Sequence, residues 1–257
     1  MYWNKGINLE IKNPGVRNFP FYYIHTICNA IILYSEKEKK DIWKINRHKI
    51  SVANNAVNFA NFPFIDDSKE KIKKEFKIPF KKVVLFVGRM RGVKKVEHII
   101  QVFNHIDLPD TGLVIVGDSM GADLSSIINK KNTIYLGEIY DPRDIQISKI
   151  FKMSDIFCIP GDVGLGLNQA FYWGLPVVTE DGLQPPEINY LTPGRNGFIV
   201  PENDLSSLKE KLILLLENDT LRKEFSENAR KDIMENGSIE RMFSGFLDCT
   251  NRICNKK

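Results

Sequence analysis

The sequence predicts an α/β protein built around a doubly wound parallel sheet. From about residue 63 onward, short apolar runs alternate with longer segments that carry apolar residues at helical spacing. The runs are apolar at every position, as expected for strands that helices cover on both faces. One run leads through a glycine-rich turn, residues 160–166, into a helix. In such a sheet ligands bind beyond the carboxyl ends of the strands, so the loops after the strands form the candidate site.

Composition points to an ordinary globular protein. Of the 257 residues, 43% are hydrophobic and 26% are charged, and the net charge of +4 is too small to indicate a nucleic-acid partner. The basic run at residues 69–82 fits a solvated helix face better than a contact with an anionic membrane. Cys28, Cys158, Cys249 and Cys254 show no metal-ligand spacing, no signal peptide is recognisable, and no apolar run reaches the roughly 18–20 residues of a membrane span. We therefore expect a cytoplasmic protein with at most peripheral membrane contact.

Residues 1–62 predict part of a domain and not a whole one. The expected elements are a helix, a strand, a second helix and a second strand, at residues 15–28, 30–34, 35–45 and 49–52. Ser35 is the expected N-cap of the second helix, and Glu38 is placed to complete a capping box. A β-α-β piece of this size cannot bury both faces of its sheet alone.

Residues 63–237 predict a self-sufficient α/β domain. Its expected strands lie at residues 83–87, 113–116, 133–136, 156–159, 176–179 and 198–200. Its expected helices lie at residues 66–76, 96–106, 122–129, 144–153, about 165 onward, 185–191, 205–217 and 220–236. Asp204 and Thr220 are the expected N-caps of the last two helices. A third segment, residues 238–257, is expected to form an amphipathic terminal helix.

The glycine-rich turn predicts an anion site. Gly161, Gly164 and Gly166 lie where the turn passes into the helix that begins at about Leu165. Glycine lets the backbone come close to a ligand, and the first amide groups of a helix have no partner within it. Because no acidic side chain lies in the first helical turn, a diphosphate is the expected occupant.

A second loop, after the strand at residues 83–87, supplies cations to the same edge of the sheet. Gly88 and Arg89 follow this strand directly, and Lys94 comes five residues after Arg89. An arginine and a lysine around a glycine-bearing loop can clamp a diphosphate from one side while the helix at Leu165 holds it from the other. Two solvated loop cations are the alternative, but the glycine-rich turn downstream favours the clamp.

These motifs resemble those of glycosyltransferases of the GT-B fold, which has two Rossmann-like domains, and specifically those of family 4. The family pattern E-G-F-G-L-x-x-x-E-A-x-x-x-G-x-P-V-V is matched at Gly164, Leu165, Ala170, Gly174, Pro176, Val177 and Val178. Gly161 and Gln169 stand where the family has its two glutamates, and residues 160–165 resemble a branch with P-G-x-V-G-L. Arg89 and Lys94 match the family's G-R-x-x-x-x-K signature.

The resemblance implies transfer of a sugar, with retention at the anomeric carbon, from a nucleotide-diphosphate-sugar donor. In this family the arginine and lysine of the signature, here Arg89 and Lys94, neutralise the leaving diphosphate in place of a metal ion. No metal and no other cofactor is therefore expected. Gln169 would accept hydrogen bonds from the ribose hydroxyls, and a plain helix-surface amide is the alternative for it.

The resemblance also implies roles for the loop after the strand at residues 133–136. Gly137 would offer backbone groups to the base, and Ile139 would offer an apolar side chain to its face. Asp162 is the candidate, by proximity, for the missing carboxylate near the donor sugar. The expected donor-binding residues are thus Gly88, Gly137, Ile139, Gly161, Asp162, Gly164, Leu165 and Gln169, with Arg89 and Lys94 as the catalytic pair.

The division of the chain follows from the same resemblance. Residues 1–62 are similar to the end of an acceptor-binding domain, where A-I-I-x-Y-S-E precedes K-I-x-V-x-x-N-x-V-N, so the chain is expected to be truncated at its N-terminus. Residues 63–237 would be the donor domain. The terminal helix would cross back and pack through Phe243, Phe246 and Leu247, with an ordinary packed helix as the alternative.

The expected acceptor is a glycan or a lipid-linked sugar in polysaccharide biosynthesis. Two alternatives stay open. A non-catalytic nucleotide-sugar-binding remnant would account for the two missing glutamates and the partial first domain. A split enzyme would account for the partial domain by a partner chain that supplies its remainder.

Overall fold

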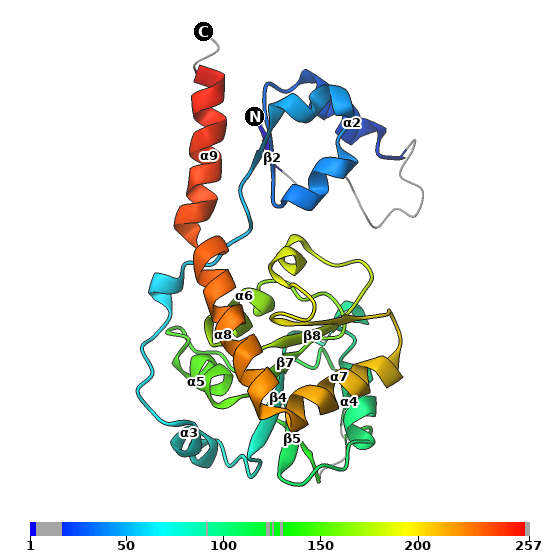
Figure 1. Cartoon of the computed structure of the whole chain (residues 1–257), viewed down its shortest axis with the longest axis vertical. Coiled ribbons are helices and arrows are strands. Elements are labelled where there is room, and N and C mark those ends of the chain that lie inside the picture. Colours follow the sequence, from blue (N-terminus) through cyan, green and yellow to red (C-terminus); the bar gives the residue numbers. More distant parts are fainter. Residues whose placement is uncertain (4–16, 91, 122–123, 125, 129–130, 255–257) are drawn as a thin grey trace. The chain divides into compact units, whose positions relative to one another are not determined.

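The computed structural model describes residues 1–3, 17–90, 92–121, 124, 126–128 and 131–254 (Figure 1). It separates into two compact units, Phe59–Met234 and a smaller one made of Met1–Asn58 with Glu235–Lys257. Among the described residues, no helix is long and apolar enough to cross a membrane. The two units are treated in turn.

The described part of the larger unit forms a sheet of six parallel strands in the order β6-β5-β4-β7-β8-β9. The strands are β4 (Lys82–Val87), β5 (Thr111–Val116), β6 (Thr133–Tyr135), β7 (Ile156–Cys158), β8 (Val177–Glu180) and β9 (Gly197–Val200). Strand β4 is central: Val84 aligns with Leu113 of β5 on one side and with Ile156 of β7 on the other. This arrangement confirms the predicted doubly wound parallel sheet.

Helices cover both faces of this sheet (Figure 1). They are α3 (Lys69–Glu75), α4 (Val96–Asn104), α5 (Ile145–Met153), α6 (Gly166–Tyr172), α7 (Leu205–Glu217) and α8 (Asp219–Asn236), with short 3-10 turns η3 (Phe59–Asn61), η4 (Gly92–Lys94) and η5 (Pro186–Tyr190). The crossovers β4-α4-β5 and β7-α6-β8 run in opposite directions along the sheet. Because parallel crossovers are right-handed, α4 and α6 lie on opposite faces. Helix α4 packs beside α7, and α3 packs beside α5.

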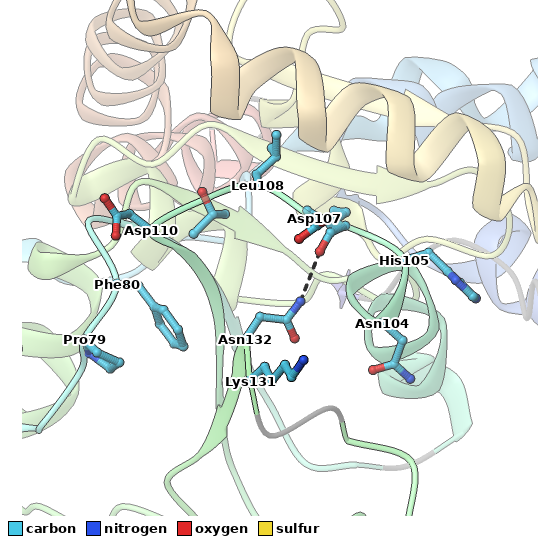
Figure 2. Close-up of a pocket in the computed structure, with 11 residues that line it drawn as sticks. Pro79, Phe80, Asn104, His105, Asp107, Leu108, Asp110, Lys131 and Asn132 are labelled. Atoms are coloured by element: carbon cyan, nitrogen blue, oxygen red, sulfur yellow. Dashed lines mark hydrogen bonds between the residues drawn. The ribbon is translucent and has the colours of Figure 1, made fainter.

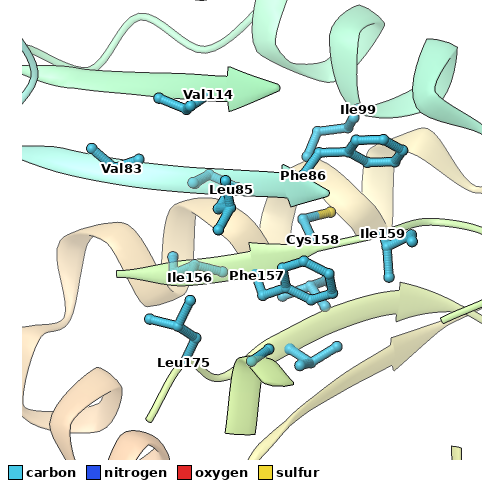
Figure 3. Packing of buried hydrophobic residues seen from close by; sticks show 14 of the residues in the cluster. Val83, Leu85, Phe86, Ile99, Val114, Ile156, Phe157, Cys158, Ile159 and Leu175 are labelled. Carbon is cyan, nitrogen blue, oxygen red and sulfur yellow. The ribbon is translucent and has the colours of Figure 1, made fainter. Parts of the chain in front are cut away.

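The strands of the larger unit are apolar throughout because helices cover both of their faces. Val83, Leu85, Phe86, Val114 and Phe157 are fully buried (Figure 3). Burial of each such side chain contributes about 1.5–3 kcal/mol to the free energy of unfolding. The core thus makes a rigid base for the loops at the strand ends.

Side-chain caps fix several helix starts. Asp204 accepts a hydrogen bond from the Ser207 amide at 3.0 Å, which confirms the predicted N-cap of α7. The predicted N-cap Thr220 of the next helix is wrong. Asn218 accepts from the Leu221 amide at 2.9 Å and starts α8 earlier, because an asparagine at this position reaches the third amide of the helix.

The helix predicted at residues 122–129 is not present in its described part. Leu124 and residues 126–128 form a turn, while residues 122, 123, 125 and 129 lie outside the described residues. The amides of Ile127 and Ile128 both donate to the Leu124 carbonyl at 3.1 Å. The Ile127 carbonyl accepts a hydrogen bond from Asn104 Nδ2 at 2.9 Å. In a longer helix this carbonyl would accept from a backbone amide instead.

The smaller unit contains three short parallel strands in the order β1-β2-β3 among its described residues. Its elements are β1 (Tyr2–Trp3), α2 (Phe19–Ile27), β2 (Ile31–Leu33), η1 (Glu36–Asp41), η2 (Lys44–Lys49), β3 (Ile50–Val52) and α9 (Ile239–Cys254). The helix predicted at residues 35–45 is instead the two 3-10 segments η1 and η2. The predicted role of Glu38 is confirmed, since its carboxylate accepts from the amides of Tyr34 and Ser35 at 2.9 and 3.2 Å.

Both faces of strand β2 are buried. Ile31 and Leu33 pack with Ile42 on one face, whereas Ile32 packs with Cys249 of α9 on the other. As predicted, residues 1–62 do not bury both faces of this sheet by themselves, because the second face is covered by a helix from the end of the chain. Helix α9 covers that face with residues that come more than two hundred positions after β2 in the chain.

The contact face of α9 differs from the predicted one. Phe246 packs edge-on against Trp3, with ring centroids 5.0 Å apart, as predicted. Phe243 and Leu247 are 58% and 45% exposed and take no part in the packing. A Cβ atom at Gly245 would lie 2.1 Å from the Val52 carbonyl oxygen, so the helix approaches β3 most closely at this glycine. Because α9 is closest to β3 at Gly245, its contact face is turned about the helix axis by roughly one residue from the predicted face.

Candidate functional site

The candidate site lies at the point where the strand order of the larger sheet reverses. Strands β4 and β7 are neighbours, and the chain leaves their carboxyl ends in opposite directions along the sheet. Such a reversal point is the usual ligand crevice of a doubly wound sheet. The loop after β4 carries Gly88, Arg89 and Lys94, and the turn after β7 carries residues 161–165. The two predicted motifs therefore meet at one place.

Two backbone hydrogen bonds join these segments. The amide of Gly161 donates to the Lys94 carbonyl at 3.2 Å, and the amide of Asp162 donates to the Val93 carbonyl at 2.8 Å. A Cβ atom at Gly161 would lie only 1.9 Å from the Val93 oxygen. Glycine is therefore required here by the packing of the two segments. This close approach also explains why no glutamate side chain stands at the position.

The Lys94 side chain forms an ion pair across the joined segments. Its Nζ lies 3.1 Å from Asp162 Oδ1 and donates to the Asp162 carbonyl at 2.5 Å. A Cβ atom at Gly164 would lie 3.4 Å from both Lys94 Nζ and Asp162 Oδ1, so the ion pair sits beside Gly164. Gly164 has φ +52, a left-handed conformation that favours glycine.

The turn leaves a short run of amide groups for a ligand. The amides of Gly161, Asp162 and Val163 are all used within the protein. In the described structure, the next amides, those of Gly164 and Leu165, have no hydrogen-bond acceptor. Helix α6 spans only seven residues. For binding an anion, these two amide groups would therefore contribute more than the dipole of so short a helix.

Gln169 lies one helical turn beyond Leu165, as predicted. Its amide donates to the Leu165 carbonyl at 3.2 Å, which puts the two residues on the same side of α6. Its side chain is half-buried. This position is within reach of a ligand at the start of α6, and the role of Gln169 toward a ribose stays a prediction.

Arg89 extends from a loop whose backbone is fixed on both sides. The Gly88 amide donates to the Val116 carbonyl and the Met90 amide to the Asp118 carbonyl, both at 3.0 Å. The Arg89 side chain is exposed, and within the described part of the chain it forms no ion pair. It is therefore an available cation at the edge where β4 ends.

Gly137 and Ile139 lie at the end of β6, two strands away from β4. The Gly137 carbonyl accepts from the Gly117 amide at 2.9 Å, and Gly137 has φ +76. Ile139 is half-buried and packs against the core of the larger unit. The structure thus places both residues at the same carboxyl edge as Gly88, whereas their contact with a base stays a prediction.

Gln184, which sequence reasoning missed, ties the glycine-rich turn to β8. Its Nε2 donates to the carbonyls of Gly161 and Glu180 at 2.9 and 2.8 Å, and its Oε1 accepts from the Val163 amide at 3.2 Å. The sequence gives only a weak indication of this role, because a glutamine in a loop is usually a solvated residue.

A buried carboxylate, also missed, holds the loop after β4 from the other side. Glu180 is fully buried at the end of β8 and accepts hydrogen bonds from Lys95 Nζ at 2.9 Å, His98 Nδ1 at 2.6 Å and the Asn203 amide at 2.9 Å. Burial acts to raise the pKa of Glu180, but the bonds from His98, Asn203 and Lys95 outweigh it and leave the pKa below its usual value. Burial likewise acts to lower the pKa of Lys95, yet its bonds to Glu180 and Glu202 leave that pKa raised.

A hollow of about 570 Å³ lies elsewhere, at the amino ends of β5 and β6 (Figure 2). Phe80, Asp107 and Lys131 are among its lining residues. Asn132 Nδ2 donates to the Ile106 carbonyl at its wall at 3.2 Å. None of the predicted site residues lines it. Because ligands of such sheets bind at the carboxyl edge, the candidate site is assigned to the β4–β7 reversal point.

The chain belongs to the family of glycosyl transferases group 1. Residues 67–232, more than half of the chain, match the model of that family. The matched segment contains the joined loops, the ion pair and the glycine-rich turn. The predicted family is thereby confirmed.

Individual relatives agree with this assignment. An uncharacterised glycosyltransferase of Methanocaldococcus jannaschii is 28% identical over 96% of this chain and 66% of the relative. The poly(ribitol-phosphate) alpha-N-acetylglucosaminyltransferase of Staphylococcus aureus is 24% identical over 87% of this chain and 44% of the relative. The chain spans between about two fifths and two thirds of the length of these relatives.

Solved structures show the same fold. Anabaena HepE, crystallised in complex with UDP, superposes with a TM-score of 0.79 at 14% identity, over 98% of this chain and 71% of that chain. At this identity the likeness concerns the fold alone. Together with the family match it confirms the predicted GT-B fold class.

Proposed function

We propose that this protein transfers a sugar from a nucleotide-diphosphate-sugar donor, with retention at the anomeric carbon, to a glycan or lipid-linked acceptor in polysaccharide biosynthesis. Family membership supports a glycosyl transfer. The relative that modifies poly(ribitol phosphate) supports a cell-surface polymer as the acceptor class, and the complex of HepE with UDP supports a nucleoside diphosphate as the leaving group.

One observation carries the proposal. The two hydrogen bonds between residues 93–94 and residues 161–162 hold Lys94 Nζ beside Gly164. A cation thereby lies beside a residue whose amide has no acceptor in the described structure. Two separate loops that each carry a weak motif become one site of the right charge for a diphosphate.

The proposed chemistry is the stabilisation of a leaving group. As the bond from the anomeric carbon to the diphosphate oxygen breaks, negative charge grows on the diphosphate. The acceptor hydroxyl oxygen bonds to the same face of the sugar, and its proton passes to the departing diphosphate oxygen. Arg89, Lys94 and the amides of Gly164 and Leu165 would stabilise that charge. The two side chains would supply the positive charge, and the proposal includes no metal ion. Gln169 would orient the ribose.

The base and the cellular site complete the proposal. Gly137 and Ile139 would contact the base at the end of β6. Cys28, Cys158 and Cys249 carry free thiols, which suits a reducing cytoplasm. A lipid-linked acceptor would bring the protein to the inner face of the membrane.

The test is calorimetric titration of the purified chain with UDP, GDP, UDP-sugars and GDP-sugars. We expect one nucleotide to bind and Arg89→Ala and Lys94→Ala each to weaken its binding at least tenfold. Lys81→Ala is the matched control, because it removes a cation just before the opposite end of β4. Absence of binding by every nucleotide would contradict the proposal, and so would equal weakening by Lys81→Ala.

A non-catalytic nucleotide-sugar-binding protein is the second candidate. The close approach at Gly161 favours it, since a family glutamate does not fit there, and Gln169 replaces the second glutamate with a neutral group. Slow donor hydrolysis, followed as release of free sugar from the bound UDP- or GDP-sugar, separates the two. Release that Lys94→Ala abolishes supports the transferase, and no release beyond that of donor in buffer supports the binding protein.

A further inference from the structure

The ion pair of Lys94 with Asp162 places a carboxylate where the proposed diphosphate binds. Asp162 Oδ1 and Lys94 Nζ lie equally close, 3.4 Å, to the Cβ position of Gly164. Gly164 also supplies the first unused amide of the turn in the described structure. The carboxylate therefore shares its surroundings with the two kinds of group that would hold a phosphate.

The backbone of Asp162 is fixed, but its side chain is not. Its amide is bonded to the Val93 carbonyl at 2.8 Å, and its carbonyl accepts from Lys94. In the described structure the carboxylate pairs with Lys94 Nζ at 3.1 Å and is 39% exposed. It can therefore rotate into solvent about χ1 without disturbing the turn.

We propose that the carboxylate of Asp162 stands in for a phosphate group and competes with the donor's diphosphate for Lys94. This inference rests on the proposed function and deepens it. A diphosphate and a carboxylate beside the same ammonium group repel each other, so the diphosphate displaces the carboxylate from Lys94. Asp162 thereby keeps Lys94 in position and weakens the hold on the leaving nucleoside diphosphate, which favours product release.

This role differs from that of a carboxylate acting on the donor sugar. A carboxylate that contacts the sugar leaves the affinity for pyrophosphate unchanged, because pyrophosphate carries no sugar. A carboxylate that competes for Lys94 changes pyrophosphate and nucleotide binding alike. The effect also depends on the presence of the Lys94 ammonium group.

The test is a double-mutant cycle measured by calorimetric titration with pyrophosphate, UDP and GDP. The proteins are the wild type, Asp162→Asn, Lys94→Met and the double variant. We expect Asp162→Asn to bind pyrophosphate and the preferred nucleotide about five to ten times more tightly than the wild type, as expected for the loss of one nearby like charge. The gain disappears when Lys94 is methionine.

Glu202→Gln is the matched control. Glu202 pairs at 3.0 Å with Lys95, the residue that follows Lys94. Glu202→Gln therefore removes one negative charge, as Asp162→Asn does, but from the partner of Lys95. We expect its affinities to equal those of the wild type. Thermal unfolding of all variants checks folding, and Asp162→Ser replaces Asp162→Asn if the latter is unfolded.

The outcomes separate the inference from the function on which it rests. Binding by the wild type with equal or weaker binding by Asp162→Asn overturns the inference and leaves the proposed function standing. A gain that persists in the Lys94→Met background, or that Glu202→Gln reproduces, also overturns it. No binding of any of the three ligands to any variant overturns both.

Discussion

The two flanks of strand β4 hold their carboxyl ends together in different ways. On the β7–β8 flank, side chains reinforce the two backbone bonds that join residues 93–94 to residues 161–162. Glu180 holds Lys95 and His98, and Gln184 binds the turn at Gly161 and Val163. The bonds of Glu180 anchor the end of the loop that carries Lys94, and the bonds of Gln184 anchor the turn that pairs with this loop.

On the β5–β6 flank, the described connections are mostly between backbone groups. The Gly88 amide bonds to the Val116 carbonyl and the Gly117 amide to the Gly137 carbonyl. A Cβ atom at Gly117 would lie 2.0 Å from the Gly88 oxygen. The Arg89 side chain, on the loop beside this flank, is exposed. The contacts with the β7–β8 flank therefore fix Lys94, whereas Arg89 on the same loop forms no ion pair within the described residues and stays adjustable.

The largest effect should follow from a methyl group at the junction of the two loops. Gly161→Ala puts a Cβ atom 1.9 Å from the Val93 oxygen, whereas in Gly88→Ala the new atom stays 3.8 Å from its neighbours. We expect Gly161→Ala to lower the free energy of unfolding by about 3 kcal/mol and Gly88→Ala by less than about 1 kcal/mol. Urea denaturation measures both. Equal losses would mean that the junction is no tighter than the start of the loop.

A smaller effect is expected from the buried carboxylate. Glu180→Gln leaves His98 without an anion and leaves Lys95 with only the exposed Glu202, so the free energy of unfolding at pH 7 should fall by about 2 kcal/mol. Glu202→Gln, an exposed partner of the same Lys95, should cost less than about 0.5 kcal/mol.

The difference in unfolding free energy between the wild type and Glu180→Gln should depend on pH. The folded-state pKa of Glu180 lies below its usual value of about 4.3, so the unfolded state binds more protons in that range. The advantage of the wild type over Glu180→Gln is complete above about pH 4.3 and shrinks as the pH falls through the folded-state pKa. Urea midpoints from pH 7 to pH 3 measure it. A difference that grows toward low pH would contradict this sign.

The smallest losses of unfolding free energy are expected when one neutral, hydrogen-bonding side chain is removed from each flank. Gln184→Met removes several bonds to the glycine-rich turn and should cost about 1–2 kcal/mol. Tyr135→Phe removes only the bond from the hydroxyl to the Gly117 carbonyl, 2.8 Å, and should cost about 0.5 kcal/mol. Chemical denaturation measures both changes. A larger loss for Tyr135→Phe would show that the β5–β6 flank also depends on its side chains.

Much of the fold was accessible from local sequence. The apolar runs gave the strands of the larger sheet, since a run such as residues 83–87 reads as a strand buried on both faces. The predicted cap at Asp204 lies directly before its helix. The loop cations and the glycine turn were also visible, because each is a motif of a few adjacent residues. Local pattern therefore determined the elements and the residues at the reversal point.

Tertiary structure alone decided how these pieces are held. His98 and Glu180 are 82 positions apart and Lys94 and Asp162 are 68 apart, so no local pattern reveals either pair. The need for glycine at position 161 arises from a carbonyl on another loop, and α9 supplies the second covering layer of the small sheet from the far end of the sequence. Side-chain partners and close backbone approaches depend on where distant segments meet, and the folded chain alone determines that.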